Sequence, residues 1–246
     1  MARMKFMNTE IDNLTMQETL QAIDQLIQEN KSAYVVTPNV DHIVQLETNK
    51  ELQAVYKNAS LILTDGKPLL WIANWYGTPI KEKISGSDLF PLLCKMAAEK
   101  GYKMFFLGAA EGVAAKAAEN LMNRFKGLQV TGTYSPAFGF EKDSVEMDKI
   151  KSMIKASGAD ILIVGLGCPK QEKFMYHHCA ELGVPISFGL GASFDFEAGN
   201  IKRAPCWMAN HGLEWLFRIT QDPKRMAKRY LVDDRKILGL AIKYKR

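Results

Sequence analysis

Residues 160–174 read Asp-Ile-Leu-Ile-Val-Gly-Leu-Gly-Cys-Pro-Lys-Gln-Glu-Lys-Phe, and this stretch decides the fold class. Residues 161–164 form an uninterrupted aliphatic run closed by glycine, which is typical of a strand buried on both faces of a parallel sheet. Gly165 and Gly167 allow a sharp turn, and Pro169 suits the first position of a following helix. The stretch therefore predicts the strand, turn and helix start from which α/β domains are built.

The start of that helix is also a candidate ligand site. The first turn of a helix has unpaired N–H groups and a partial positive charge, which bind phosphate or sugar oxygens. We expect Lys170 and Gln171 to project toward such a ligand, beside Gly165 and Gly167. A turn that serves packing alone would also use these glycines, so this structural alternative stays open. A dehydrogenase is disfavoured, because Gln171 is near the place of the third fingerprint glycine and no acidic residue ends a strand about twenty residues on.

The alternation of strand and helix continues through most of the 246 residues. Residues 4–12 are expected to form a short strand or hairpin, and Thr15 with Glu18 predicts a capping box that opens a helix through about residue 28. Further buried strands are predicted at residues 33–36, 61–63, 103–107, 128–133 and 185–190. We therefore expect one α/β domain, residues 1–199, followed by a compositionally different appendage, residues 200–246.

Polar side chains follow two of these strands, at the edge where open α/β sheets bind ligands. Thr37 and Asn39 come directly after strand 33–36, and Asp65 follows strand 61–63. A carboxylate at a strand end, followed by a glycine and a helix start, is well placed to act as a general base. Asn39 and Asp65 could also simply cap the helices that follow them, and this alternative stays open.

No metal site is predicted. Asp195 and Glu197 loosely resemble an acidic pair that holds a metal ion, but they lie in residues 191–199, which we expect to form a glycine-rich turn. A hydrogen-bonding role for Asp195 is at least as well supported. A second group matches no common ligand spacing and is better explained by a helix with incidental histidines: Cys168, His177, His178 and Cys179.

The formal net charge is +5, and basic residues crowd together from Lys202 to the end of the chain. This implies an acidic partner, which could be nucleic acid, an anionic membrane surface or a diphosphate. No signal-peptide pattern and no apolar run of about twenty residues is present, so we expect a soluble or peripheral protein. The four cysteines form no CxxC pair and fit a reducing cytoplasm: Cys94, Cys168, Cys179 and Cys206.

The appendage combines aromatic, aliphatic and basic residues. Within residues 224–246, Arg225, Lys228 and Arg229 recur at a spacing that suits one side of a helix, and residues 237–241 supply an apolar side. This pattern is compatible with amphipathic helices that lie in a membrane interface. A solvated basic helix packed on the domain is the alternative.

Five short motifs, taken in order, resemble those of the WecG/TagA/CpsF glycosyltransferases. They are Gly-Leu-Gly-Cys-Pro-Lys-Gln-Glu at 165–172, Gly-Ala-Ser-Phe-Asp-Phe at 191–196, Lys-Arg-Ala-Pro at 202–205, Gly-Leu-Glu-Trp at 212–215 and Arg-Tyr-Leu at 229–231. Thr37-Pro-Asn and Asp65-Gly fit the N-terminal half of the same family, so the resemblance covers nearly the whole chain, from about residue 9 to residue 231. Phe174 and Phe217 occupy positions where Trp and Tyr are expected, and both keep an aromatic ring.

The resemblance implies a Rossmann-like domain, a mostly parallel sheet flanked by helices, with a C-terminal helical appendage that engages the membrane. It implies inverting transfer of N-acetylmannosamine from UDP to the 4-hydroxyl of GlcNAc-diphosphate-undecaprenol at the cytoplasmic face of the cell membrane. In one branch of the family the product is the linkage unit of wall teichoic acid. Relatives use other UDP-sugars, such as the uronic acid form of the same sugar, and no single residue of this sequence decides between them.

Within that reaction, Asp65 is the expected base that takes the proton from the acceptor hydroxyl. Thr37 and Asn39 would orient the sugar or acceptor, Gln171 would bond to the sugar or a phosphate, and Asp195 would hold a donor hydroxyl or amide. The leaving diphosphate gains negative charge, and helix N-termini with Arg218 and Arg225 would stabilise it in place of a metal. We expect no cofactor and no metal requirement.

Two classes of protein other than a transferase remain. A nucleic-acid-binding module would use the basic, aromatic appendage, and a redox enzyme would use the turn at Gly165. Neither explains Asn39 and Asp65 at strand ends, so no nucleic acid partner is expected. The sequence leaves open the donor sugar and whether the chain forms a homo-oligomer.

Overall fold

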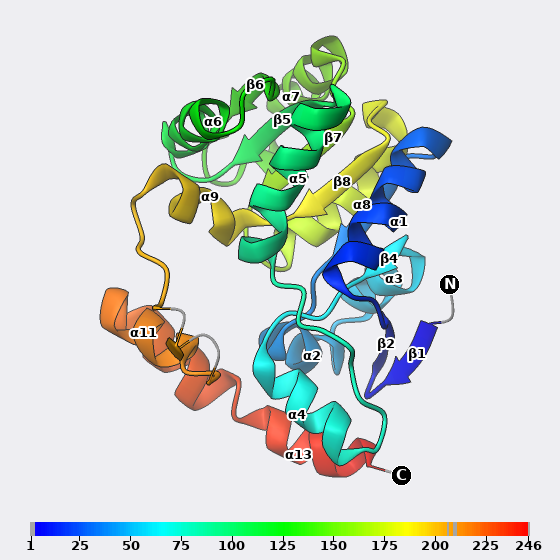
Figure 1. Cartoon of the computed structure of the whole chain (residues 1–246), viewed down its shortest axis with the longest axis vertical. Coiled ribbons are helices and arrows are strands. Elements are labelled where there is room, and N and C mark those ends of the chain that lie inside the picture. Colours follow the sequence, from blue (N-terminus) through cyan, green and yellow to red (C-terminus); the bar gives the residue numbers. More distant parts are fainter. Residues whose placement is uncertain (1–2, 206, 209–210, 246) are drawn as a thin grey trace.

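The computed structural model describes residues 3–205, 207–208 and 211–245, so Cys206 and Arg246 lie outside it. Six parallel strands form the central sheet, in the order β4-β3-β8-β7-β5-β6 (Figure 1). Their bounds are β3 Ala33–Val36, β4 Leu61–Ile62, β5 Lys103–Gly108, β6 Gln129–Tyr134, β7 Ile161–Gly165 and β8 Ile186–Gly189. The predicted α/β class and strands are confirmed.

The predicted N-terminal hairpin is also present, as β1 (Arg3–Phe6) and β2 (Thr9–Asp12), which pair antiparallel in a separate sheet. The Asp12 carboxylate accepts a hydrogen bond from the Ile62 backbone N–H at 2.8 Å and another from Arg3 Nε at 3.2 Å. The first bond attaches the hairpin to the edge strand β4, and the second joins the two strands of the hairpin.

Helices cover both faces of the sheet, because successive residues of a strand point to opposite sides. Phe105 and Leu162 pack in one core layer, and Phe106 and Ile163 pack in the other. The first layer is closed by α2 (Val40–Leu46), α3 (Lys50–Asn58), α4 (Lys67–Trp75), α7 (Ser144–Ser157) and α8 (Lys170–Leu182). The second is closed by α1 (Met16–Glu29), α5 (Gly86–Lys100) and α6 (Val113–Arg124). The short 3-10 helix η1 (Phe140–Lys142) precedes α7.

The capping box at the start of α1 is confirmed. Thr15 Oγ1 accepts from the Glu18 backbone N–H at 3.2 Å, and the Thr15 backbone N–H donates to Glu18 Oε2 at 2.7 Å. The two side chains thus satisfy N–H groups that the first turn leaves without helical partners.

The prediction of a glycine-rich turn at residues 191–199 is wrong, because Gly191–Ala198 form helix α9. Gly191 here permits close approach: a Cβ at this position would lie 3.0 Å from the Gly165 Cα of β7. Phe194 is fully buried between Phe90 and Phe106, with ring centroids 5.6 and 5.3 Å away. Burial of this ring holds a short helix against the sheet.

The strand order reverses between β3 and β8. From β3 the chain moves outward to β4, and α4 and α5 then lead across to β5 on the other side of β8 and β7. Since all six strands are parallel, their carboxyl ends share one edge. A crevice at this edge, where the order reverses, is the usual ligand site of such sheets.

After α9 the chain runs along the outside of α2 and α4 (Figure 1). Its elements there are α11 (Glu214–Gln221), α12 (Pro223–Lys228), the π-helical turn η2 (Arg229–Asp233) and α13 (Lys236–Tyr244). Tyr76 Oη of the core donates to the Ala241 carbonyl at 2.7 Å, Tyr244 Oη donates to Glu47 at 3.0 Å, and Ile237 is buried. No helix in the described part of the chain has both the length and the apolar character to span a membrane.

Candidate active site

Two cavities lie at the carboxyl edge of the sheet and meet at Asp65. The polar cavity has a volume of about 440 Å³, and its lining includes Thr37, Gly167, Gln171 and Asp195. The apolar groove, between α4 and the appendage, has a volume of about 400 Å³, and its lining includes Trp215, Leu231, Ile237 and Leu238. Four residues line both: Asn39, Asp65, Arg218 and Arg229.

Asp65 lies directly after β4, and its backbone N–H donates to the Pro38 carbonyl at 2.8 Å. It does not cap α4, because Gly66 occupies the N-cap position and no side-chain cap bond forms. In the described part of the chain no hydrogen bond reaches the Asp65 carboxylate, which is therefore available to a ligand. Burial raises the pKa of Asp65, while the cations Arg218 and Lys83 oppose that rise. A carboxylate with these properties suits a general base.

The appendage supplies the two cationic residues that line both cavities. Arg218 of α11 lies 2.6 Å from Glu214 Oε1 and faces both cavities. Arg229 donates to Asn39 Oδ1 at 3.2 Å and lies 3.7 Å from Asp41 Oδ2. Because Arg229 lies in η2 and Asn39 directly precedes α2, this contact joins the appendage to the edge of the sheet.

Thr37 and Gln171 are both buried, with 8% and 7% of their surfaces exposed. Gln171 lies across the end of β8: a Cβ at Gly189 would be 2.8 Å from Gln171 Nε2, and one at Gly191 would be 2.9 Å from Oε1. Gln171 Nε2 donates to Glu172 Oε1 at 2.8 Å, whereas buried Oε1 has no partner in the structure. Two glycines thus make room for an amide whose oxygen is free for a ligand.

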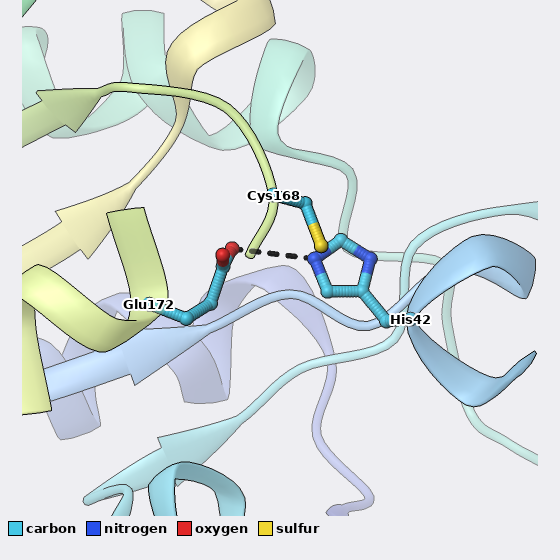
Figure 2. A group of neighbouring side chains, drawn as sticks. All are labelled: His42, Cys168 and Glu172. Atoms are coloured by element: carbon cyan, nitrogen blue, oxygen red, sulfur yellow. Dashed lines mark hydrogen bonds and ion pairs between the residues drawn. The ribbon is translucent and has the colours of Figure 1, made fainter. Parts of the chain in front are cut away.

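His42, Cys168 and Glu172 lie together beside the polar cavity (Figure 2). Their potential ligand atoms all fall within 4.8 Å of one another, and no other such group occurs among the residues that the structure describes. His42 Nε2 is 3.2 Å from Glu172 Oε1, and His42 Nδ1 is 2.9 Å from Asn39 Oδ1. Because both ring nitrogens already face acceptor oxygens, the arrangement does not fit a metal site, which needs a nitrogen lone pair.

Not all of the ligand residues predicted in the 160–174 stretch lie at the polar cavity. Gly165 lines the polar cavity and is also required for packing, since a Cβ there would lie 2.6 Å from the Phe194 ring. Gly167 adopts a φ of +77°, which favours glycine, and lines the polar cavity. Lys170 lies outside both cavities, with its ammonium 2.6 Å from Glu141. The structure therefore does not bring Lys170 to the site.

The remaining predicted residues are on α9 and α12. Asp195 lines the polar cavity, whereas Glu197 lies 3.6 Å from Arg124 and lines neither cavity. The two carboxylates therefore do not form a pair. Arg225 lies on α12, but its side chain is outside the described part of the chain.

Three residues of the site were not predicted from the sequence: His42, Glu172 and Arg229. His42 lies three residues after Asn39 at the end of strand 33–36, Glu172 closes the 165–172 motif, and Arg229 opens the Arg-Tyr-Leu motif. Their place in those motifs was the available signal. No role could be assigned because each contact spans more than a hundred residues, 130 between His42 and Glu172 and 190 between Asn39 and Arg229.

Comparison with known proteins identifies the family. The model of the glycosyl transferase WecG/TagA/CpsF family matches residues 4–246. The N-acetylglucosaminyldiphosphoundecaprenol N-acetyl-beta-D-mannosaminyltransferase of Bacillus spizizenii is 35% identical over 199 residues, 81% of this chain and 75% of the relative. The proteins of the same name from Bacillus subtilis (30% identity; 82% and 75% covered) and Staphylococcus aureus (26%; 92% and 88%) are also similar. The chain therefore belongs to the WecG/TagA/CpsF family of glycosyltransferases.

Proposed function

We propose that this chain transfers N-acetylmannosamine from UDP-N-acetylmannosamine to the 4-hydroxyl of GlcNAc-diphosphate-undecaprenol, with inversion. The names of the relatives specify this acceptor and this sugar. The single observation that carries the proposal is the position of Asp65, at the junction of a polar cavity and an apolar groove. The polar cavity suits a sugar nucleotide, and the apolar groove suits a lipid-linked acceptor. The product is the linkage unit of wall teichoic acid.

The reaction follows from this arrangement. The donor occupies the polar cavity, and the acceptor sugar reaches Asp65 from the apolar groove, with its lipid chain toward Leu231 and Leu238. Asp65 takes the proton of the 4-hydroxyl while that oxygen attacks the anomeric carbon from the side opposite UDP. UDP leaves with the electron pair of the broken bond. Arg218 and Arg229, which line both cavities, stabilise the phosphate charge.

We propose further that transfer needs no metal ion, since arginines and helix N-termini meet the diphosphate. Activity is therefore expected to remain near its initial value after EDTA treatment, measured as UDP release with the lipid acceptor. Loss of activity that Mn²⁺ or Mg²⁺ restores would show a metal requirement.

The proposed location is the cytoplasmic face of the cell membrane, with the appendage on the lipid surface. Leu238 and Ile242 of α13 are 69% and 70% exposed, and Trp75 of α4 is 49% exposed close by, under Lys245 at 3.9 Å. Basic residues near an anionic leaflet contribute about 1 kcal/mol each to membrane binding. Lys236, Lys243 and Lys245 could provide this attraction next to the apolar side chains.

Leu238→Asp with Ile242→Asp is expected to abolish most binding to vesicles that contain anionic lipid, because two charges replace the inserted side chains. Val145→Asp is the matched control, since Val145 is 76% exposed on α7, away from the appendage. Co-sedimentation measures the bound fraction. Unchanged binding of the double variant would mean that another surface of the protein contacts the membrane.

Asn39→Asp separates ligand binding from helix capping. Asn39 is the N-cap of α2, and aspartate caps equally well, so the fold is expected to persist. If the Asn39 NH₂ group also donates to the substrate, the variant loses about tenfold in kcat/KM, since a buried acceptor left without its donor costs about 1–3 kcal/mol. Wild-type kcat/KM would restrict Asn39 to capping.

A donor screen tests the proposed activity. A short-chain GlcNAc-diphosphate lipid is incubated with each of several UDP-sugars, and UDP release is followed. UDP-N-acetylmannosamine is expected to give the highest kcat/KM. Preference for its uronic acid form would assign the chain to another surface polysaccharide, and turnover with no UDP-sugar would contradict the proposal.

A further inference from the structure

A chain of four buried or half-buried side chains crosses the edge of the sheet from β3 to β7. His42 Nε2 is 3.2 Å from Glu172 Oε1 (Figure 2). Asn39 Oδ1 is 2.9 Å from His42 Nδ1, and Gln171 Nε2 is 2.8 Å from the same Glu172 oxygen. Glu172 is 1% exposed and His42 is also buried. The two ends of this chain, Asn39 and Gln171, both line the polar cavity.

The partners of His42 decide its protonation. Arg229 can only donate, so the Asn39 atom that it contacts at 3.2 Å is an acceptor oxygen. His42 Nδ1 must then donate to that oxygen, and Nε2 must donate to the Glu172 carboxylate. The Asn39 backbone N–H also points at Nδ1, but at 3.4 Å this contact is longer than the 2.9 Å contact to Oδ1. Both ring nitrogens therefore carry protons, and the ring is an imidazolium.

Electrostatics agree with this geometry. Burial by itself lowers the pKa of His42, but Cys168 and Glu172 raise it well above its ordinary value. Burial raises the pKa of the Cys168 thiol, whereas His42 lowers it. The counter-charge that the geometry supplies is the Glu172 carboxylate, 3.2 Å from His42 Nε2. Asp65 also interacts with the ring, and Arg229 lies on the Asn39 side of it. His42 and Glu172 thus form a buried ion pair. Removal of one partner from such a pair strongly destabilises the fold, because the other charge is left buried and unpaired.

The pair determines which end of each amide faces the cavity. His42 and Arg229 both hydrogen-bond to Asn39 Oδ1, so the Asn39 NH₂ group remains available to a ligand. Gln171 Nε2 donates to Glu172, and the buried Gln171 Oε1 has no hydrogen-bond partner among the described residues. A ligand in the polar cavity therefore meets a hydrogen-bond donor, the Asn39 NH₂ group after β3, and a hydrogen-bond acceptor, the Gln171 carbonyl on α8. A phosphate has no proton to give at neutral pH, so Gln171 Oε1 fits a sugar hydroxyl or an amide N–H instead.

We infer that His42 and Glu172 are positioning residues, an imidazolium–carboxylate pair that presents the Asn39 NH₂ and the Gln171 carbonyl to the donor sugar. This assigns Gln171 to the sugar and excludes it from the diphosphate. The inference rests on the proposed function only for the identity of the ligand, since the pair itself is a property of the chain without ligand.

The pair is tested without substrate by nitrogen NMR of the histidine rings. The sequence has four histidines, so His42 can be assigned by comparison with a His42→Gln spectrum. Two protonated ring nitrogens are expected for His42 at pH 7.5, while the ordinary histidine is largely neutral there. A neutral ring would overturn the inference, and so would stoichiometric Zn²⁺ bound through His42 and Cys168.

The positioning role is tested by Glu172→Gln, which keeps the shape and an acceptor oxygen but removes the counter-charge. A fall of about 10- to 100-fold in kcat/KM is expected, the scale of a small misplacement of binding groups. Tyr34→Phe is the control for the loss of a buried hydrogen bond in the same core layer. Tyr34 Oη donates to the Val55 carbonyl at 2.5 Å, and Tyr34 lines neither cavity. That control is expected to keep wild-type kcat/KM.

A double-mutant cycle then asks whether Glu172 acts through Gln171. In a Gln171→Ala background, Glu172→Gln is expected to lower kcat/KM by less than about threefold, because residues that act as one unit are non-additive. Full additivity of the two changes, with both proteins folded, would overturn the assignment. Loss of activity toward every donor with an intact imidazolium signal would instead count against the proposed function alone.

Discussion

Asp65→Asn is expected to lower kcat by about a hundredfold or more, the usual scale for loss of a general base, while UDP-sugar binding stays close to wild type. Asparagine has nearly the same shape as aspartate but cannot take the proton of the acceptor hydroxyl. Since no described side chain hydrogen-bonds to the Asp65 carboxylate, the change should disturb the fold little. Steady-state kinetics with the lipid acceptor and calorimetry with the donor separate the two effects.

The pH profile of the wild type provides the control for this interpretation. A base must be deprotonated to act, and burial raises the pKa of Asp65 above the ordinary carboxyl value of 3.8. The rate is therefore expected to fall as the pH decreases through that raised pKa, and the fall should be absent from residual Asp65→Asn turnover. Near wild-type turnover of the variant at pH 7 would remove Asp65 from the role of base.

Arg218→Ala is expected to reduce kcat by about 100- to 1,000-fold, the range for removing a group that stabilises charge in the transition state. Arg218 faces both cavities and interacts with Asp65, so its loss affects the leaving diphosphate and the base together. Arg218→Lys should restore only part of the rate, because lysine lacks the planar fork that binds two phosphate oxygens.

Arg124→Ala is the matched control for this change. Arg124 lies 3.6 Å from Glu197, much as Arg218 pairs with Glu214, but it lines neither cavity. Its removal is expected to leave kcat unchanged. Equal losses in the two variants would indicate a general effect of charge and would contradict a specific role for Arg218.

Local sequence signals predicted the elements that depend on local chemistry. The aliphatic run at 161–164 became β7, and Thr15 with Glu18 formed the capping box of α1. The strand ends at Asn39 and Asp65 converge on one site because every strand of the sheet is parallel. That convergence follows from topology, which the alternation of strands and helices already implied.

The sequence could not predict contacts that form only after folding. Residues 191–199 looked like a turn because a glycine stands at each end, yet Gly191 lets α9 approach β7 and Phe194 anchors the helix. Lys170 was placed near the ligand by its helix position, but Glu141 pairs with it outside the cavities. Nothing local links His42 to Glu172, which approach only when β3 and β7 lie in one sheet.

We propose a single displacement in which Asp65 deprotonates the acceptor and no covalent sugar–enzyme intermediate forms. The most direct test is the anomeric configuration of the product, measured by NMR on the purified glycolipid made from an α-linked UDP-N-acetylmannosamine donor. A β linkage to the 4-position of GlcNAc is expected, because attack opposite UDP inverts the anomeric centre. An α-linked product would mean that the anomeric configuration is retained, which contradicts a single in-line displacement.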